Sequence, residues 1–442
     1  MKWLRALLIS VFVTAVQQPA WSLTLIRDAE VEDLLKEMLQ SVFKVAGLNP
    51  KSAKVYVIKS SSINAFTIGN GYVFITSGLL FRFPNPLQIL GILCHETAHI
   101  AARHIDRLIT ALKTSSRNSI FAILTGMLVA AVTGRQEAIA MILGYAETDL
   151  RLFLRFNRSE EMAADLLAAT YLEKLGFAVD VFIDVLLAFE RMDILNGNAN
   201  LPAYLSDHPP TGDRMAALQK KVTNKQYTPP RELLCRFRRA QIKLLAYLGQ
   251  HNLRTIAPQD EYAQTIYLRR TGKVREAIEI LRTLVRDNPG DIYYKESLAQ
   301  TLYEYGELPE AIRVYQEIYH KDVNMLIKVN LAHVLITAQQ QLDQAISILE
   351  AATYVDDVDS NVYRLLSIAY GKQRKYGLAM FSLGMEQLLQ QNFRLAEEIF
   401  TECLTKLDPK TEAPAIKKAK YYKELIERNF PEGLRFLSFF TK

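Results

Sequence analysis

Residues 90–107 read LGILCHETAHIAARHIDR and contain His95, Glu96 and His99 in the order H-E-x-x-H. Two histidines four residues apart lie on one face of a helix, so both rings can reach a single cation. Zinc suits imidazole, and a catalytic zinc takes three protein ligands and a water. Glu96 would lie beside that water and could accept its proton. The same letters also fit a solvated helix face, so the identity of a third ligand decides between the two.

The candidate third ligand lies in FNRSEEMAADLLAATYL, residues 156–172, which is also typical of a helix. Glu161 would complete a His-His-Glu set. Asp165, one turn later, could accept a hydrogen bond from the far nitrogen of a zinc-bound histidine and fix its tautomer. Two carboxylates on a solvated face are the alternative. Four apolar neighbours favour a buried helix instead: Ala163, Ala164, Leu166 and Leu167.

HETAHIAARH (95–104) together with NRSEEMAAD (157–165) resembles the HtpX and CAAX-prenyl-protease family of gluzincins. The resemblance implies that Glu161, the first glutamate of the family's E-x-E-A-D motif, binds zinc. It also implies that Asp165 supports a zinc-bound histidine. This sequence departs from the motif at Ala163, where the family has a second glutamate that is not a ligand. His104 has a family counterpart, but we assign it no chemistry.

Two further segments resemble the same family. INAFTIGNGYVFITSGLL (63–80) resembles its N-A-F…G-L-L segment, which implies that Asn64, Ala65 and Phe66 border a bound, extended peptide through edge-strand hydrogen bonds. LSDHPPTGDRM (205–215) resembles its H-P-x-x-x-x-R segment and contributes His208 and Arg214, the latter as a residue behind the ligands.

The resemblance leaves three roles open for His208. It could donate a hydrogen bond to the oxyanion of the reaction. It could instead occupy the open zinc position and hold the enzyme latent. A histidine before two prolines could also simply anchor its loop.

The predicted fold class is α+β: a mostly helical zincin-type metallopeptidase domain with a small β-sheet, followed by an all-α tetratricopeptide-repeat solenoid. The 442 residues suffice for two or three domains. β-branched and aromatic residues precede the H-E-x-x-H helix and flank a Gly69-Asn70-Gly71 turn, which predicts a hairpin. We expect a signal peptide at 1–22, the peptidase domain at 23–228 and the repeats at 229–430.

The repeats follow from four alanines in matching contexts, each 34 residues after the one before: Ala277, Ala311, Ala345 and Ala379. That spacing is the period of the tetratricopeptide repeat, in which a small residue stands where two helices approach closely. Gly272 and Gly306 mark turns, and Ala396 indicates a further unit. A plain helical bundle would not require this register.

The first 22 residues have a basic start and a short apolar core, which predicts a signal peptide cleaved near Ser22 and export to the periplasm. An apolar run at 119–134 is followed, after Arg135 and Glu137, by a second run, AIAMILG, and the two predict a buried helical hairpin. The alternative for the run at 119–134 is a peripheral membrane contact. Three cysteines leave at least one thiol unpaired, and a Cys235–Cys403 disulfide stays open. The net charge of +6, with no dense basic run, does not suggest a nucleic-acid partner.

The predicted function is that of an exported zinc endopeptidase with one zinc per chain, held by His95, His99 and Glu161, with Glu96 moving the proton. Resemblance to the periplasmic, repeat-carrying branch of the family implies polypeptide substrates among misfolded or misassembled outer-membrane proteins. It also implies that the repeats dock on the assembly machinery or on substrates. The alternative is a periplasmic chaperone or scaffold that acts through its repeats and carries a latent or structural zinc site.

Overall fold

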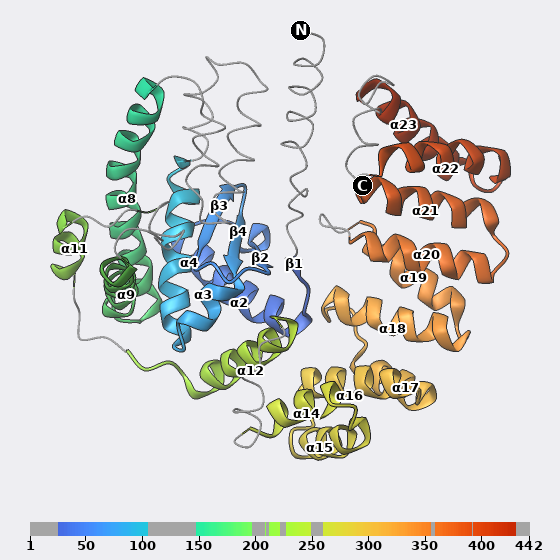
Figure 1. Cartoon of the computed structure of the whole chain (residues 1–442), viewed down its shortest axis with the longest axis horizontal. Helices are drawn as coiled ribbons and strands as arrows, with labels where there is room; N and C mark the ends of the chain where they lie inside the picture. The colour runs from blue at the N-terminus through green and yellow to red at the C-terminus, as the bar shows by residue number, and fades with distance from the viewer. Residues whose placement is uncertain are drawn as a thin grey trace, which may run out of the picture. The chain divides into compact units, whose positions relative to one another are not determined.

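A computed structural model of the chain describes residues 25–104, 147–196, 208, 212–221, 227–248, 260–354, 359–390 and 392–429. Residues 21–267 form one compact unit and residues 268–442 belong to the other (Figure 1). The expected signal peptide at 1–22 and the apolar run at 119–134 lie outside the described residues. The predicted α+β class with an all-helical C-terminal region is confirmed.

The first unit is built around a small mixed sheet. Its strands are β1 (Leu25–Ile26), β2 (Lys54–Ile58), β3 (Ala65–Gly69) and β4 (Tyr72–Thr76), in the order β1-β2-β4-β3. β2 and β4 are parallel, whereas β3 and β4 form the predicted antiparallel hairpin. Asn70 and Gly71 have φ of 50° and 86°, which suits a hairpin turn of the primed type. β3 is therefore an edge strand of the described sheet.

One face of the sheet carries the hydrophobic core. Val55, Val57, Val73 and Ile75 are buried there together with the apolar side of α2 (Ala29–Ala46). The Asp28 side chain caps α2 by accepting from the Val31 N–H, and Gly47 ends the helix at a φ of 74°. A short 3-10 turn, η1 (Pro50–Ser52), then leads into β2.

The helix that carries the H-E-x-x-H motif is α4 (Pro86–Ala101), which follows the short α3 (Ser77–Arg82). α4 begins just after Asn85, whose side chain accepts from the Leu87 N–H, and Pro86 occupies the first turn. Nearly all of α4 is buried. A Cβ at Gly91 would lie 3.0 Å from the Phe182 Cβ, so glycine permits the close approach of α9 (Asp180–Asn196).

Three more helices complete the surroundings of α4. The long α8 (Glu147–Leu175) packs along it, and α11 (Gly212–Gln219) packs on α8. α12 (Arg231–Leu248) packs on α2, α3 and α4. Lys243 lies 3.3 Å from Asp28, and Arg239 pairs with Glu30, both pairs being buried. The helix just past the expected boundary at 228 therefore adheres to the peptidase core.

The C-terminal unit is a succession of helices that begins within α14, and from α15 onward each helix packs against the next. They are α14 (Glu261–Arg270), α15 (Val274–Asp287), α16 (Ile292–Tyr305), α17 (Leu308–Ile318), α18 (Met325–Ala338), α19 (Leu342–Ala352), α20 (Ser360–Lys372), α21 (Tyr376–Leu389), α22 (Phe393–Lys406) and α23 (Ala413–Asn429). Left-handed φ values recur at Gly272, Gly306 and Arg374, that is, at multiples of 34 residues. The arrangement is consistent with a repeat solenoid, and its assignment as tetratricopeptide repeats stays a prediction.

The structure also bears on the three cysteines and on the question of a membrane-spanning helix. Cys94 and Cys403 are buried and Cys235 is exposed, and the structure records all three as free thiols. Cys235 and Cys403 belong to different units, so the disulfide considered for them stays an untested prediction. Within the described part of the chain, none of the helices combines the length and the apolar character needed to cross a bilayer.

Candidate active site

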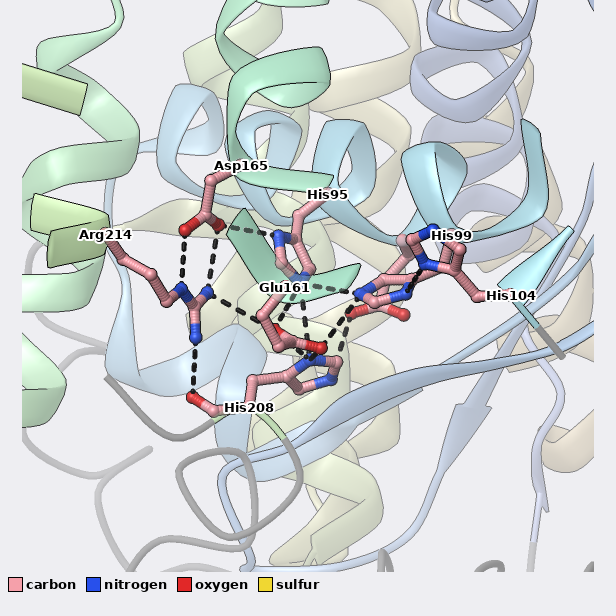
Figure 2. Close-up of polar contacts among 8 residues, drawn as sticks. His95, His99, His104, Glu161, Asp165, His208 and Arg214 are labelled. Carbon is pink, nitrogen blue, oxygen red and sulfur yellow. Dashed lines mark hydrogen bonds and ion pairs between the residues drawn. The ribbon is translucent and has the colours of Figure 1, made fainter. Parts of the chain in front are cut away.

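Three elements bring four candidate metal ligands together. His95 and His99 come from α4, Glu161 comes from α8, and His208 comes from the segment between α9 and α11 (Figure 2). All four side chains are buried, and one ligand atom of each lies within 4.8 Å of the others. The sequence predicted the first three as one set of zinc ligands and left the role of His208 open.

The spacing of these atoms fits a tetrahedral zinc site. The His95 Nε2 lies 3.0 Å from the His99 Nε2, 3.2 Å from the His208 Nδ1 and 3.3 Å from the Glu161 Oε2. The His99 Nε2 is 3.3 Å from the Glu161 Oε1, and the His208 Nδ1 is 3.0 Å from both oxygens of Glu161. Zinc–ligand bonds of ~2.0–2.1 Å place tetrahedral ligands about 3.3–3.4 Å apart. The cluster therefore suits one zinc ion.

Behind the ligands, a carboxylate and a guanidinium fix their orientation. The His95 Nδ1 lies 3.0 Å from the Asp165 Oδ1, which leaves its Nε2 to face the cluster. Arg214, on α11, donates to both oxygens of Asp165 at 2.6 and 2.9 Å. The same guanidinium lies 3.3 Å from the Glu161 Oε2 and donates to the His208 carbonyl at 3.3 Å. Arg214 thus links both carboxylates of α8 to the segment that carries His208.

The electrostatics favour a dication. Glu96, Glu161 and Asp165 are 0–1% exposed and Arg214 is 2% exposed, so with the histidines in the neutral form that binds a metal, three carboxylates and one guanidinium leave a net charge of −2. Burial alone lowers the pKa of His95, yet hydrogen bonds to Asp165 and Glu161 raise it to about 10. Positive charge is therefore stabilised at this point.

His99 behaves differently. Burial, together with the charges of its histidine neighbours, lowers the pKa of His99 to about 3, although Glu161 opposes the shift. The ring is therefore neutral, which is the form in which imidazole binds a metal.

Glu96 follows His95 on α4 and is completely buried. Its Oε1 lies 3.6 Å from the His208 Nε2. The imidazole of His208 therefore stands between Glu96 and the other ligands, where an attacking water would have to be. This placement bears directly on the open question of its role.

The expected substrate residues lie beside this cluster rather than in it. Ala65 and Phe66 begin β3, the edge strand that packs next to α4, and Asn64 precedes them. Asn64 and Ala65 are buried, and the Phe66 ring stacks on Phe74 with centroids 5.2 Å apart.

One buried residue that contacts the cluster, His104, has no role in the sequence-based prediction. The His104 Nδ1 lies 2.8 Å from the His99 Nδ1 (Figure 2). Its separation of five residues from His99 is not a helical spacing, so no periodicity argument places it there.

A buried His-His-Glu set on two packed helices, with a glutamate between the histidines, defines a zinc-type metallopeptidase. Residues 26–222 match Peptidase family M48. The chain therefore carries a metallopeptidase domain similar to that family, with a site for one zinc ion.

Relatives extend the similarity beyond this domain. A Vibrio cholerae protein is 24% identical over 415 residues, covering 87% of this chain and 80% of the relative. The beta-barrel assembly-enhancing protease of Escherichia coli (strain K12) is 23% identical over 331 residues, which cover 71% of this chain and 66% of the relative's length. The mitochondrial metalloendopeptidase OMA1 of Arabidopsis thaliana is 31% identical over 160 residues, or 36% of this chain and 29% of the relative.

Proposed function

We propose that this chain is a periplasmic zinc endopeptidase that hydrolyses misfolded or misassembled outer-membrane proteins. The observation that carries the endopeptidase part is the buried, tetrahedrally spaced set of His95, His99 and Glu161 with Glu96 beside it. Relatives named for β-barrel assembly support the substrate class, and the basic and apolar pattern of residues 1–22 supports export.

Zinc, when bound, would polarise the scissile carbonyl and acidify a water. In this proposal Glu96 takes the water's proton and passes it to the leaving amine, which is the work of a general base and acid. Asp165 and Arg214 hold His95 in the tautomer that presents its Nε2 to the metal. β3 receives the substrate as an added strand, because it is the edge strand of the described sheet and packs beside α4.

The same geometry supports latency through His208. Its Nδ1 completes the tetrahedral spacing and its Nε2 faces Glu96, so its ring fills the place that the water needs. The segment is tied down by Arg214, which donates to its backbone carbonyl. Cleavage would therefore require His208 to leave, and the repeats would recruit the substrates or partners that promote this.

The test is zinc content together with hydrolysis of an unfolded protein by the wild type, Glu96→Gln and Glu161→Ala. We expect zinc near one per chain in the wild type and in Glu96→Gln, because glutamine keeps the shape of Glu96 and removes only its basicity. We expect weaker zinc binding in Glu161→Ala and no cleavage in either variant. A Glu96→Gln protein that cleaves as fast as the wild type would refute the proposed general base.

The position of His208 also favours a second candidate, a scaffold that acts through its repeats while the zinc site stays closed. The two functions separate in an outer-membrane assembly assay. A scaffold predicts full activity of Glu96→Gln, whereas a protease predicts its loss. Both proteins would carry the same zinc and the same fold.

A further inference from the structure

We infer that His104 is the residue that positions the zinc ligand His99, doing for that ring what Asp165 does for His95. This inference rests on the proposed zinc site. It concerns a buried histidine, 4% exposed, that neither the proposed reaction nor the ligand set uses.

The hydrogen bond between the two rings has a defined direction. The His104 Nδ1 and the His99 Nδ1 lie 2.8 Å apart, with the rings at 76° to one another. One of the two nitrogens must donate and the other must accept. The His99 Nε2 faces the cluster and needs its lone pair for a cation, so the hydrogen of His99 is on Nδ1. His99 therefore donates and His104 accepts at Nδ1.

The backbone is shaped to bring His104 to this place. On an uninterrupted helix, residues five apart point about 140° from one another, so His104 would face away from His99. α4 instead ends at Ala101, and Arg103 takes a φ of 53°, in the left-handed region that side chains with a Cβ disfavour. This turn carries the next residue back over the end of α4. Strained backbone of this kind is typical of functional sites.

The two zinc histidines therefore have partners of different chemistry. The His95 Nδ1 meets a carboxylate that Arg214 holds in place, whereas the His99 Nδ1 meets an imidazole. Loss of a partner behind a ligand typically weakens metal binding about 10- to 100-fold. We expect His104 to have an effect of this size through the orientation and tautomer of His99.

Zinc affinity, measured on the full chain by competition with a chromophoric chelator, tests the inference without relying on cleavage. We expect His104→Ala to bind zinc about 10- to 100-fold more weakly than the wild type. His104→Asn places an amide oxygen near the former Nδ1 and should restore affinity to within a few-fold. His104→Gln places its oxygen nearer the former Nε2 and should not. Arg103→Gly is the control, because glycine adopts the same φ and keeps His104 in place.

Each outcome decides one question. Wild-type affinity in His104→Ala would overturn the inference, and so would equal weakening by Asn and Gln, since that would mean a packing role. Should alanine prevent folding, the comparison of Asn with Gln still tests the position of the acceptor atom. Failure of the wild-type chain to bind zinc at all would instead overturn the proposed function.

Discussion

Replacing His208 with alanine should convert a closed site into an open one. In the closed arrangement the His208 Nδ1 lies 3.0 Å from Glu161, and Arg214 donates to its carbonyl at 3.3 Å. A hydrogen bond to a charged group contributes about 1.5–3 kcal/mol and a second bond about 1 kcal/mol. The closed state is then favoured by about 2.5–4 kcal/mol, which corresponds to roughly 60- to 700-fold. The cleavage rate of His208→Ala should therefore exceed the wild-type rate by up to that factor.

The assay is hydrolysis of a fluorescently labelled unfolded protein at matched zinc content, comparing wild type with His208→Ala. The double variant Glu96→Gln/His208→Ala should be inactive, which shows that the increase comes from this site. Slower cleavage by His208→Ala at equal zinc content would refute latency. It would assign His208 to stabilisation of the oxyanion, whose loss typically costs about 10²–10³ in rate.

Three further outcomes are expected. Arg214→Met should lower the stability of the zinc-free chain by about 3–5 kcal/mol, because buried Asp165 loses its guanidinium partner and keeps only His95, and an unchanged melting temperature would contradict this. Gly306→Ala should lower the free energy of unfolding in urea by about 1 kcal/mol, while Arg374→Gly should leave it unchanged or raise it, because both positions have φ above 60°. A destabilised Arg374→Gly beside an unchanged Gly306→Ala would contradict the shared turn. A maleimide should label only Cys235 in the folded chain, because burial raises the pKa of the other two thiols; labelling of a second thiol would contradict their packing.

The parts of the site that depend on local spacing were predictable. His95 and His99 share a face because four residues make about one helical turn, and the same spacing presents Glu161 and Asp165 together on α8. The hairpin at Asn70 and the N-cap at Asn85 likewise depend on a few adjacent residues.

The remaining contacts depend on where non-helical segments run, which periodicity does not encode. His208 reaches the ligands from 47 residues beyond Glu161. His104 reaches His99 through one left-handed residue, Arg103, in a sequence that reads as continuing helix. No single-sequence pattern specifies that a residue other than glycine or asparagine takes this conformation.

The packing of α21, the helix that carries Ala379, does not follow from the 34-residue period. Ala277, Ala311 and Ala345 are fully buried, but Ala379 is only partly buried. On the same helix a Cβ at Gly384 would lie 2.6 Å from the Phe400 ring, so glycine is what lets α21 and α22 approach. Ala396 follows Ala379 by only 17 residues. α21 therefore packs closely with the helix after it as well as with the helix before it.

Charge balance connects the fold of the peptidase domain to its metal. The core around α4 encloses Glu96, Glu161 and Asp165 against a single guanidinium from Arg214, and a net charge of −2 is costly to bury. A dication among the ligands would cancel this charge, so its binding would contribute to folding as well as to chemistry. The same reasoning explains why the carboxylates are tied to histidines and to Arg214 rather than left to solvent. For these residues, the arrangement that stabilises the native core is therefore the same arrangement that binds zinc.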